Sequence, residues 1–134
     1  EEFVSRKIAR AAARIKLGLQ DKLTLGNLSA ARDWGYAPDY VEAIWQMVQQ
    51  DQPDDYVIAT GESHTVEEFV AAAFGHVGLD WHEYVDFDQQ LLRLAEVDHL
   101  QGDATKSRKK FCCRPNTSFY RLVEIMVDAE LENL

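Results

Sequence analysis

Residues 56–78 read YVIATGESHTVEEFVAAAFGHVG and place a β-branched run directly before a helical pattern. The run at 56–60 predicts a buried strand. Thr65 and Glu68 fit a capping box, in which hydroxyl and carboxylate each accept a backbone N–H of the other residue. Apolar residues then recur at helical spacing, at Val66, Phe69, Val70, Ala73 and Val77. A strand that leads into an amphipathic helix is typical of an α/β chain.

Upstream, residues 4–19 predict a first helix with one apolar stripe. The basic residues of this stretch fall on the opposite face, namely Arg6, Lys7, Arg10 and Arg14. Residues 23–25 predict a short strand that stops at Gly26. Pro38 suits the first turn of a second helix, because its missing N–H is not needed there. We expect the apolar stripe of this second helix to be buried: Val41, Ile44, Trp45 and Val48.

Downstream, residues 81–84 predict a helical turn and residues 85–87 a brief strand. Asp103 caps a predicted short basic helix through Lys110. Ser118 caps a predicted last helix with the apolar stripe Phe119, Leu122, Val123 and Met126. The resulting order is α/β, with strands too few and too scattered to form a good sheet alone. We therefore expect part of a larger α/β unit.

Length and charge limit the classes of function that this chain can have. The 134 residues fit one domain or a piece of one. The net charge of −9 has the wrong sign for non-specific binding to nucleic acid or to an anionic membrane. Residues 1–36 carry seven basic and four acidic groups, whereas the remainder is strongly acidic. The N-terminal part is thus the part expected to meet an anionic partner.

No apolar run reaches the roughly 20 residues that a membrane helix needs. The chain opens on Glu1 and Glu2 rather than on Met or a basic signal segment, so we expect its first residue to be internal to a longer polypeptide. Cys112 and Cys113 are adjacent and give no disulfide framework. A reducing, cytoplasmic location is the simplest expectation, with an organelle or a large complex as the alternatives.

Motifs for catalysis and cofactor binding are missing from the sequence. It contains no G-x-G-x-x-G, no P-loop and no Tyr-x-x-x-Lys pair, and its four histidines lack metal-ligand spacing. Cys113 has basic neighbours but no base that the sequence places beside it. We predict no catalytic, cofactor-binding or metal-binding residue in this chain.

Two arginines stand in unusual surroundings. Arg32 lies in an Asp-, Trp- and Gly-bearing loop before a helix, and Arg93 lies in the apolar run 91–95. Each requires a partner. For Arg93 this is Glu96 or Asp98 in a structural ion pair, or an anionic ligand that matches the planar guanidinium.

Beyond these residues, several stretches resemble a known family. They are residues 3–8, 25–28, 32–37, 39–43, 54–62, 64–69, 96–98 and 102–106. In this order they are similar to the C-terminal half of the GDP-mannose 4,6-dehydratase family, a branch of the extended short-chain dehydrogenases/reductases. The similarity covers nearly the whole chain and tends toward plant members.

The resemblance implies a Rossmann-type enzyme of which residues 1–134 form the C-terminal, nucleotide-sugar-binding portion, without the N-terminal dinucleotide-binding half. Residues 33–60 are expected to return to the Rossmann domain. The implied reaction oxidises GDP-mannose at C4 with NADP, removes water across C5 and C6, and returns hydride to C6. Catalytic Ser/Thr, Glu, Tyr and Lys residues and most NADP contacts belong to the N-terminal half, so this chain alone is expected to be inactive.

Carried over by position, the resemblance assigns seven residues to the GDP-sugar pocket. They are Val4, Lys7, Leu25, Asn27, Arg32, Arg93 and Glu96. In this assignment the three basic side chains face the diphosphate, and Glu96 accepts ribose hydroxyls. The implied partners are GDP-mannose, the Rossmann half or a complementary chain, and further copies in a homo-oligomer or larger assembly.

The sequence departs from the family pattern in two places. Residues 92–97 read LRLAEV where the family has an aromatic before the arginine and a proline after it. Residues 111–115 read FCCRP where the family has Leu-Gly/Asn-Trp-Lys-Pro. These changes motivate the alternative of a non-catalytic, SDR-derived subunit or scaffold piece. An unrelated anion-binding module that uses the basic first helix is a third hypothesis.

Overall fold

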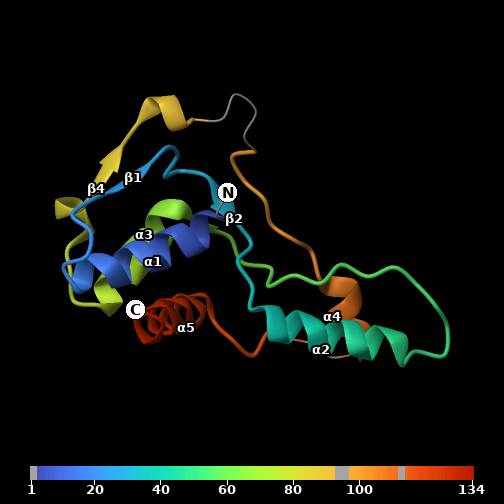
Figure 1. Cartoon of the computed structure of the whole chain (residues 1–134). Coiled ribbons are helices and arrows are strands. Elements are labelled where there is room, and N and C mark those ends of the chain that lie inside the picture. The colour runs from blue at the N-terminus through green and yellow to red at the C-terminus, as the bar shows by residue number, and fades with distance from the viewer. Residues whose placement is uncertain (1–2, 93–96, 112–113) are drawn as a thin grey trace.

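The computed structural model describes residues 3–92, 97–111 and 114–134. Its helices are α1 Val4–Lys16, α2 Ala37–Val48, α3 Val66–His76, α4 Thr105–Phe111 and α5 Phe119–Glu132. Its strands are β1 Leu23–Leu25, β2 Ala31–Arg32, β3 His64–Thr65 and β4 Val85–Phe87, and two 3₁₀ turns are η1 Trp81–Glu83 and η2 Gln89–Leu91 (Figure 1). The predicted α/β class is confirmed.

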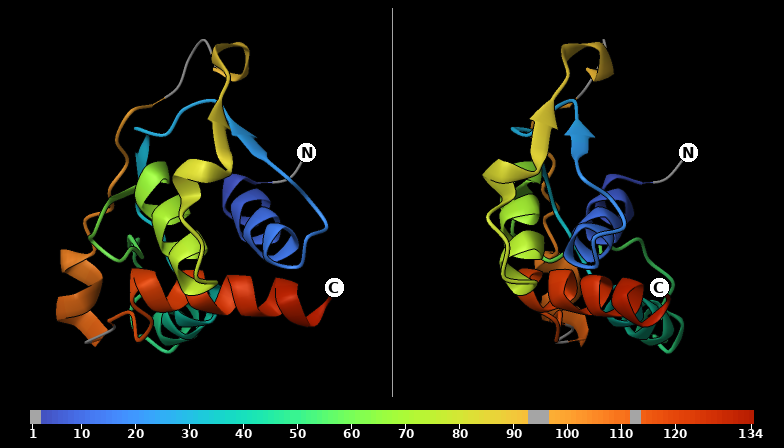
Figure 2. Two further views of the ribbon diagram at one scale, coloured as in Figure 1. Left: turned by 90° about the vertical axis from the view of Figure 1, so that its left-hand side faces the viewer. Right: turned by 60° about the vertical axis from the view of Figure 1, so that its left-hand side comes forward.

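The core lies between α1, α3 and α5. Helices α1 and α3 stand beside each other, and α5 crosses at one end of the pair (Figure 2). Phe69 of α3 is fully buried, and its ring centroid lies 5.1 Å from that of Trp34 and 5.9 Å from that of Phe119. The apolar stripes predicted for the first, third and last helices therefore face one another, as the burial of apolar area requires.

The strands form two small sheets. β1 pairs with β4 in parallel, with Leu23 opposite Val85, and β2 pairs with β3 in antiparallel orientation, with Arg32 opposite His64. A parallel pair needs a crossover connection, and here the chain between β1 and β4 includes α3. Each sheet of the described chain has two strands, in agreement with the expectation that the strands could not make a good sheet.

The predicted helix starts are confirmed by their caps. The Thr65 hydroxyl accepts from Glu68 N at 3.1 Å, and Thr65 N donates to the Glu68 carboxylate at 2.6 Å. The Ser118 hydroxyl accepts from Arg121 N, and the Asp103 carboxylate accepts from Thr105 N. Side chains thus satisfy backbone donors that have no acceptor within the helix.

The predicted burial of the α2 stripe is wrong for the described chain. Exposed fractions are high for all four residues: Val41 65%, Ile44 55%, Trp45 61% and Val48 72%. Only Ala43 of this helix is buried. Helix α2 lies at the edge of the molecule, away from β1 and β4 (Figure 1). The periodicity identified an apolar face correctly but could not say that no described element covers it.

The strand predicted at residues 56–60 is also absent from the described structure. No neighbouring described strand offers a hydrogen-bonding ladder, and side chains of α4 take that place. Lys106 Nζ donates to Asp55 O, Ser107 Oγ to Val57 O, and the Arg108 guanidinium to Thr60 O. A β-branched sequence becomes a strand only where a partner strand is present.

The position of Phe69 gives a stability test. Phe69→Ala is expected to lower the free energy of unfolding by about 3–5 kcal/mol, because it leaves a cavity among Trp34, Phe119 and their neighbours. Phe87→Ala is the matched control, since Phe87 is 53% exposed, and should cost less than about 1.5 kcal/mol. Urea denaturation followed by circular dichroism measures both. Equal losses would contradict a core centred on α3.

Candidate functional site

Three of the seven predicted pocket residues belong to α1 and β1. Val4 and Lys7 lie three residues apart at the start of α1, and therefore on one side of it. Lys7 Nζ donates to Thr24 O at 2.8 Å, which fastens the start of α1 to β1. Leu25 ends β1 and is buried, so its side chain belongs to the core.

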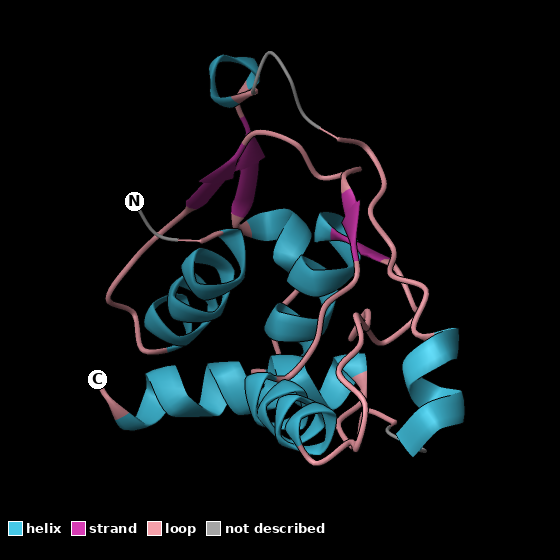
Figure 3. Cartoon of the chain, turned by 90° about the vertical axis from the view of Figure 1, so that its right-hand side faces the viewer, coloured by secondary structure: helices cyan, strands magenta, loops and turns pink. Residues whose placement is uncertain are grey.

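The segment that follows β1 leads across the helix ends to β2 (Figure 3). Asn27 lies on this segment, and Arg32 is the last residue of β2. The Asn27 carboxamide oxygen accepts from Ser29 N at 3.0 Å and from Ala30 N at 3.3 Å, a local turn that shapes this segment. Arg32 ends β2, and its Nη1 donates to Ala31 O at 2.8 Å. Arg93 and Glu96 lie outside the described residues, as do the altered positions Leu94, Cys112 and Cys113.

Gly26 allows the backbone of η2 to lie close to the segment between β1 and β2. A Cβ built at Gly26 would lie 2.6 Å from Leu91 O and 2.7 Å from Leu91 C, closer than any side chain tolerates. Glycine is therefore required where the turn before Asn27 meets the backbone of η2.

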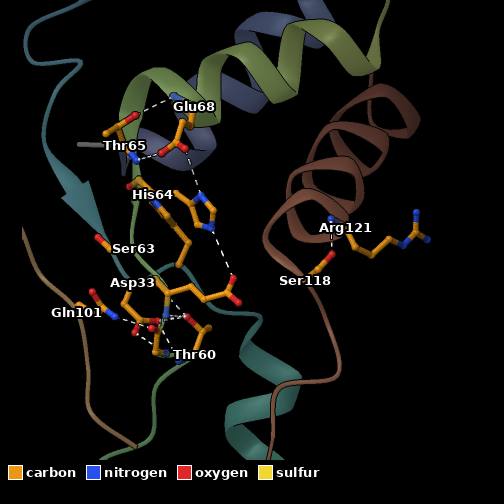
Figure 4. Close-up of polar contacts among 12 residues, drawn as sticks. Asp33, Thr60, Ser63, His64, Thr65, Glu68, Gln101, Ser118 and Arg121 are labelled. Atoms are coloured by element: carbon orange, nitrogen blue, oxygen red, sulfur yellow. Dashed lines mark hydrogen bonds and ion pairs between the residues drawn. The ribbon is translucent and has the colours of Figure 1, made fainter.

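Asp33, directly after Arg32, is the centre of the polar structure nearby (Figure 4). Its Oδ1 accepts from Thr60 N at 2.9 Å and from the Thr60 hydroxyl at 2.6 Å. Its Oδ2 accepts from Gly61 N at 3.0 Å and from Gly102 N at 3.1 Å. A Cβ at Gly102 would lie 2.2 Å from the Ala59 Cβ, so that position needs glycine. One carboxylate thus joins three distant segments.

Burial disfavours the ionised form of Asp33. The hydrogen bonds from Thr60, Gly102 and Gly61 outweigh that effect and hold the pKa of Asp33 below its ordinary value of 3.8. Backbone bonds add to the same junction, since Ala31 N donates to Asp98 O at 2.7 Å and Leu100 N donates to Ala31 O at 3.0 Å. The strand that carries Arg32 is therefore fixed from both sides.

A cavity lies elsewhere in the described structure, away from Lys7, Asn27 and Arg32. It encloses about 590 Å³ and is lined by parts of residues 60–64, by Arg108 and by residues 114–119. None of the five described pocket residues predicted from sequence borders it. Lys7, Asn27 and Arg32 are each partly exposed.

The described residues hold no group of three or more His, Cys, Asp or Glu side chains that could bind a metal ion. No helix in the described ranges is long and apolar enough to cross a membrane. The chain also has no glycine-rich loop with which it could hold a dinucleotide by itself.

Comparison with solved structures identifies the class. A structure of RMD from Pseudomonas aeruginosa complexed with NADPH matches 98% of this chain with a TM-score of 0.89 at 19% identity, and the match covers 43% of that chain. dTDP-glucose 4,6-dehydratase from Bacillus anthracis, in complex with NAD, matches 94% of this chain and 39% of its own with a TM-score of 0.79. The fold is that of the C-terminal portion of extended SDR enzymes of Rossmann type.

Sequence comparison then gives the family. The family model for GDP-mannose 4,6 dehydratase matches residues 1–126, so the chain belongs to that family. GDP-mannose 4,6 dehydratase 2 of Arabidopsis thaliana is 59% identical over 132 residues, and the human GDP-mannose 4,6 dehydratase is 46% identical over 147 residues. These matches cover 98% and 97% of this chain, but only 35% and 40% of the two relatives.

In the sequence, Asp33 stands out only as a member of the Arg-Asp-Trp loop. Its hydrogen-bond donors at Thr60 and Gly102 are 27 and 69 residues away in the chain, so no local spacing could reveal them. The signals available in sequence were the glycines at 61 and 102, which allow backbone N–H groups to approach a carboxylate closely.

Asp33→Asn tests the role of the carboxylate. The pKa of Asp33 is lower in the folded state, so its ionised form stabilises the fold above about pH 4, and this contribution is lost as the pH falls through the folded pKa. The variant is expected to lose about 1–3 kcal/mol of unfolding free energy at pH 7, because the Asn amide cannot accept both sets of bonds.

Urea denaturation at pH 7 and at pH 3 measures both effects. The difference in unfolding free energy between the wild type and Asp33→Asn should shrink at the lower pH. Asp21→Asn, at an exposed carboxylate, is the matched control and should leave the stability at pH 7 within about 0.5 kcal/mol of the wild type. A gap for Asp33→Asn that grows in acid would refute the assignment.

Proposed function

We propose that this chain supplies the GDP-sugar-binding portion of a GDP-mannose 4,6-dehydratase. Membership of the family, with 59% identity to a plant relative of that name, is the observation that carries the proposal. The chain spans 35–40% of the plant and human relatives it matches, so the proposed activity is that of a longer protein or of a complex with a complementary chain.

In the proposed reaction GDP-D-mannose is converted into GDP-4-dehydro-6-deoxy-D-mannose and water. NADP, when bound, takes hydride from C4 and returns it at C6. We assign NADP binding mainly to the part of the enzyme that relatives carry beyond this match. The role of this chain is to bind and orient the nucleotide sugar, with Lys7 and Arg32 as donors to diphosphate oxygens.

The geometry supports this assignment in part. Lys7, Asn27 and Arg32 occupy the start of α1 and the segment from β1 to β2. Lys7 and Arg32 already donate to the carbonyls of Thr24 and Ala31, which restricts their side chains before any ligand binds. In this proposal Arg93 and Glu96 complete the pocket. Their assignment comes from the family resemblance alone. A cytoplasmic location and a homo-oligomeric or larger assembly belong to the same proposal.

We also propose that residues 33–60 pack against the Rossmann portion. The support is the exposed apolar face of α2 together with the β-branched segment at 56–60, which lacks a partner strand among the described residues. Covering such a face and adding a strand partner would remove both features from water at once.

The ligand assignment is tested in the protein completed with the N-terminal portion. Arg32→Gln should weaken GDP binding by about tenfold or more, because a charge-assisted hydrogen bond to phosphate is lost. Arg6→Gln is the matched control, since Arg6 is exposed and paired with Glu130, and it should change the affinity less than about twofold. Isothermal titration calorimetry measures both.

A completed wild-type protein without affinity for GDP-mannose would contradict the proposed function and favour the non-catalytic subunit. Equal effects of Arg32→Gln and Arg6→Gln would instead remove Arg32 from the pocket while leaving the function intact.

The packing of α2 has its own test. Ile44→Glu should change the stability of the 134-residue chain by less than about 1 kcal/mol, because the side chain is 55% exposed. In the completed protein the same change should cost more than about 2 kcal/mol, because it buries a charge. Gln49→Glu, at an exposed position after α2, should be nearly neutral in both. Thermal denaturation measures these differences, and an equal effect of Ile44→Glu in both proteins would exclude the docking.

A further inference from the structure

Unpaired buried atoms converge on one cavity. Among the described residues, the buried side-chain nitrogen and oxygen atoms without a hydrogen-bond partner are His64 Nδ1, His64 Nε2 and Arg108 Nε. Both residues line the cavity of about 590 Å³. Buried polar atoms are nearly always paired, and an unpaired one costs about 1–3 kcal/mol. Their gathering at a single cavity points to a group that binds there.

Arg108 is held in a fixed orientation at this cavity. Its Nη2 donates to Thr60 O. Its Nε has no acceptor among the described residues. Gly61 has φ +80°, and a Cβ there would lie 2.8 Å from Arg108 Nη2, so the glycine makes room for the guanidinium. The guanidinium of this cavity-lining arginine is thus restricted in orientation, and its Nε donor is unused.

The start of α5 forms another part of the wall of this cavity. Ser118 and Phe119 line the cavity, and the backbone N–H groups of Phe119 and Tyr120 are in the first turn, where no intrahelical acceptor exists. The Ser118 hydroxyl caps a third N–H, that of Arg121. The start of this 14-residue helix therefore adds partial positive charge to the same space.

Arg114 adds a second guanidinium. It lines this cavity together with Arg108, and the same two arginines also line a neighbouring cavity of about 360 Å³. Lys109 of α4 lines the neighbouring cavity as well. In a chain with net charge −9, this wall between the two cavities is locally basic.

His64, which Figure 4 shows beside Glu68, and Glu62 also line this cavity. The His64 ring stacks on Phe119 with a centroid distance of 3.9 Å. Its Nε2 lies 3.7 Å from the Glu62 carboxylate and its Nδ1 3.6 Å from the Glu68 carboxylate, both beyond hydrogen-bonding distance. Among the described residues that line the cavity, Glu62 is the only acidic one, and at 74% exposure it can turn toward water when an anion enters.

From these contacts we propose that the cavity between α4 and the start of α5 binds a phosphate group. Its donors come from three parts of the chain: from Arg108 on α4, from Arg114 and from the first turn of α5. A carboxylate offers two oxygens in one plane, whereas a tetrahedral phosphate offers more oxygens and can accept from several donors at once. This site is separate from the proposed GDP-sugar pocket, whose described residues do not line the cavity.

Titration of the ¹⁵N-labelled 134-residue chain with inorganic phosphate tests the site at low ionic strength. Phosphate should shift the amide resonances of Phe119 and Tyr120 saturably, with a dissociation constant in the millimolar range. Arg114→Gln should weaken this binding by about tenfold, since a charge-assisted hydrogen bond is lost. Arg121→Gln is the matched control, because Arg121 is on the same helix end but pairs with Glu124, and should change the affinity less than about twofold.

Arg114 is exposed, so Arg114→Gln is expected to fold normally, as circular dichroism would verify. Arg108→Gln, which also removes the bond to Thr60 O, is a second variant and should weaken phosphate binding as well.

Acetate at equal concentration distinguishes phosphate from a carboxylate ligand and should bind at least about tenfold more weakly. The proposal is overturned by a linear, non-saturable response to phosphate, by equal losses in Arg114→Gln and Arg121→Gln, or by acetate binding as tightly as phosphate.

Discussion

The carboxylate of Asp33 is the interaction on which the arrangement of the segments depends. It accepts bonds from Thr60, Gly61 and Gly102, which connects the end of β2 to the approach to β3 and to the segment before α4. Four donors on one carboxylate keep it ionised and leave little freedom for the segments that carry them. Arg32, the neighbouring residue, is placed by the same junction.

The molecule has one part in which the helices bury their apolar faces against one another and a second part in which apolar side chains stay exposed. Helices α1, α3 and α5 bury one another through residues such as Ile8, Phe69 and Val123. Helix α2 instead presents its apolar face to water, and residues 56–60 are held by side chains of α4 rather than by another strand. These two features support the proposal that residues 33–60 pack against the Rossmann portion, and the relatives are more than twice as long as this chain.

The two basic regions of the chain have different structural settings. Lys7 lies at the start of α1 and Arg32 at the end of β2, and each side chain donates to a backbone carbonyl nearby. Arg108 and Arg114 lie across the junction at a cavity that also receives a helix N-terminus. The basic excess of residues 1–36 thus corresponds in part to the first region, whereas the second region comes from a short basic stretch at residues 106–114 within an otherwise acidic part of the chain.

The sequence by itself determined whatever depends on neighbours a few residues apart. Helix stripes, the Thr65 and Ser118 caps, the short strands at 23–25 and 85–87 and the family could all be predicted from it. The tertiary structure alone decided which stripes are buried, as the exposed Trp45 shows, and which donors reach Asp33 across 69 residues. It also gathered His64, Arg108 and Arg114 at one cavity. The reason is physical: periodicity and capping are local to one turn, whereas burial and long-range hydrogen bonds depend on which segments the fold brings together.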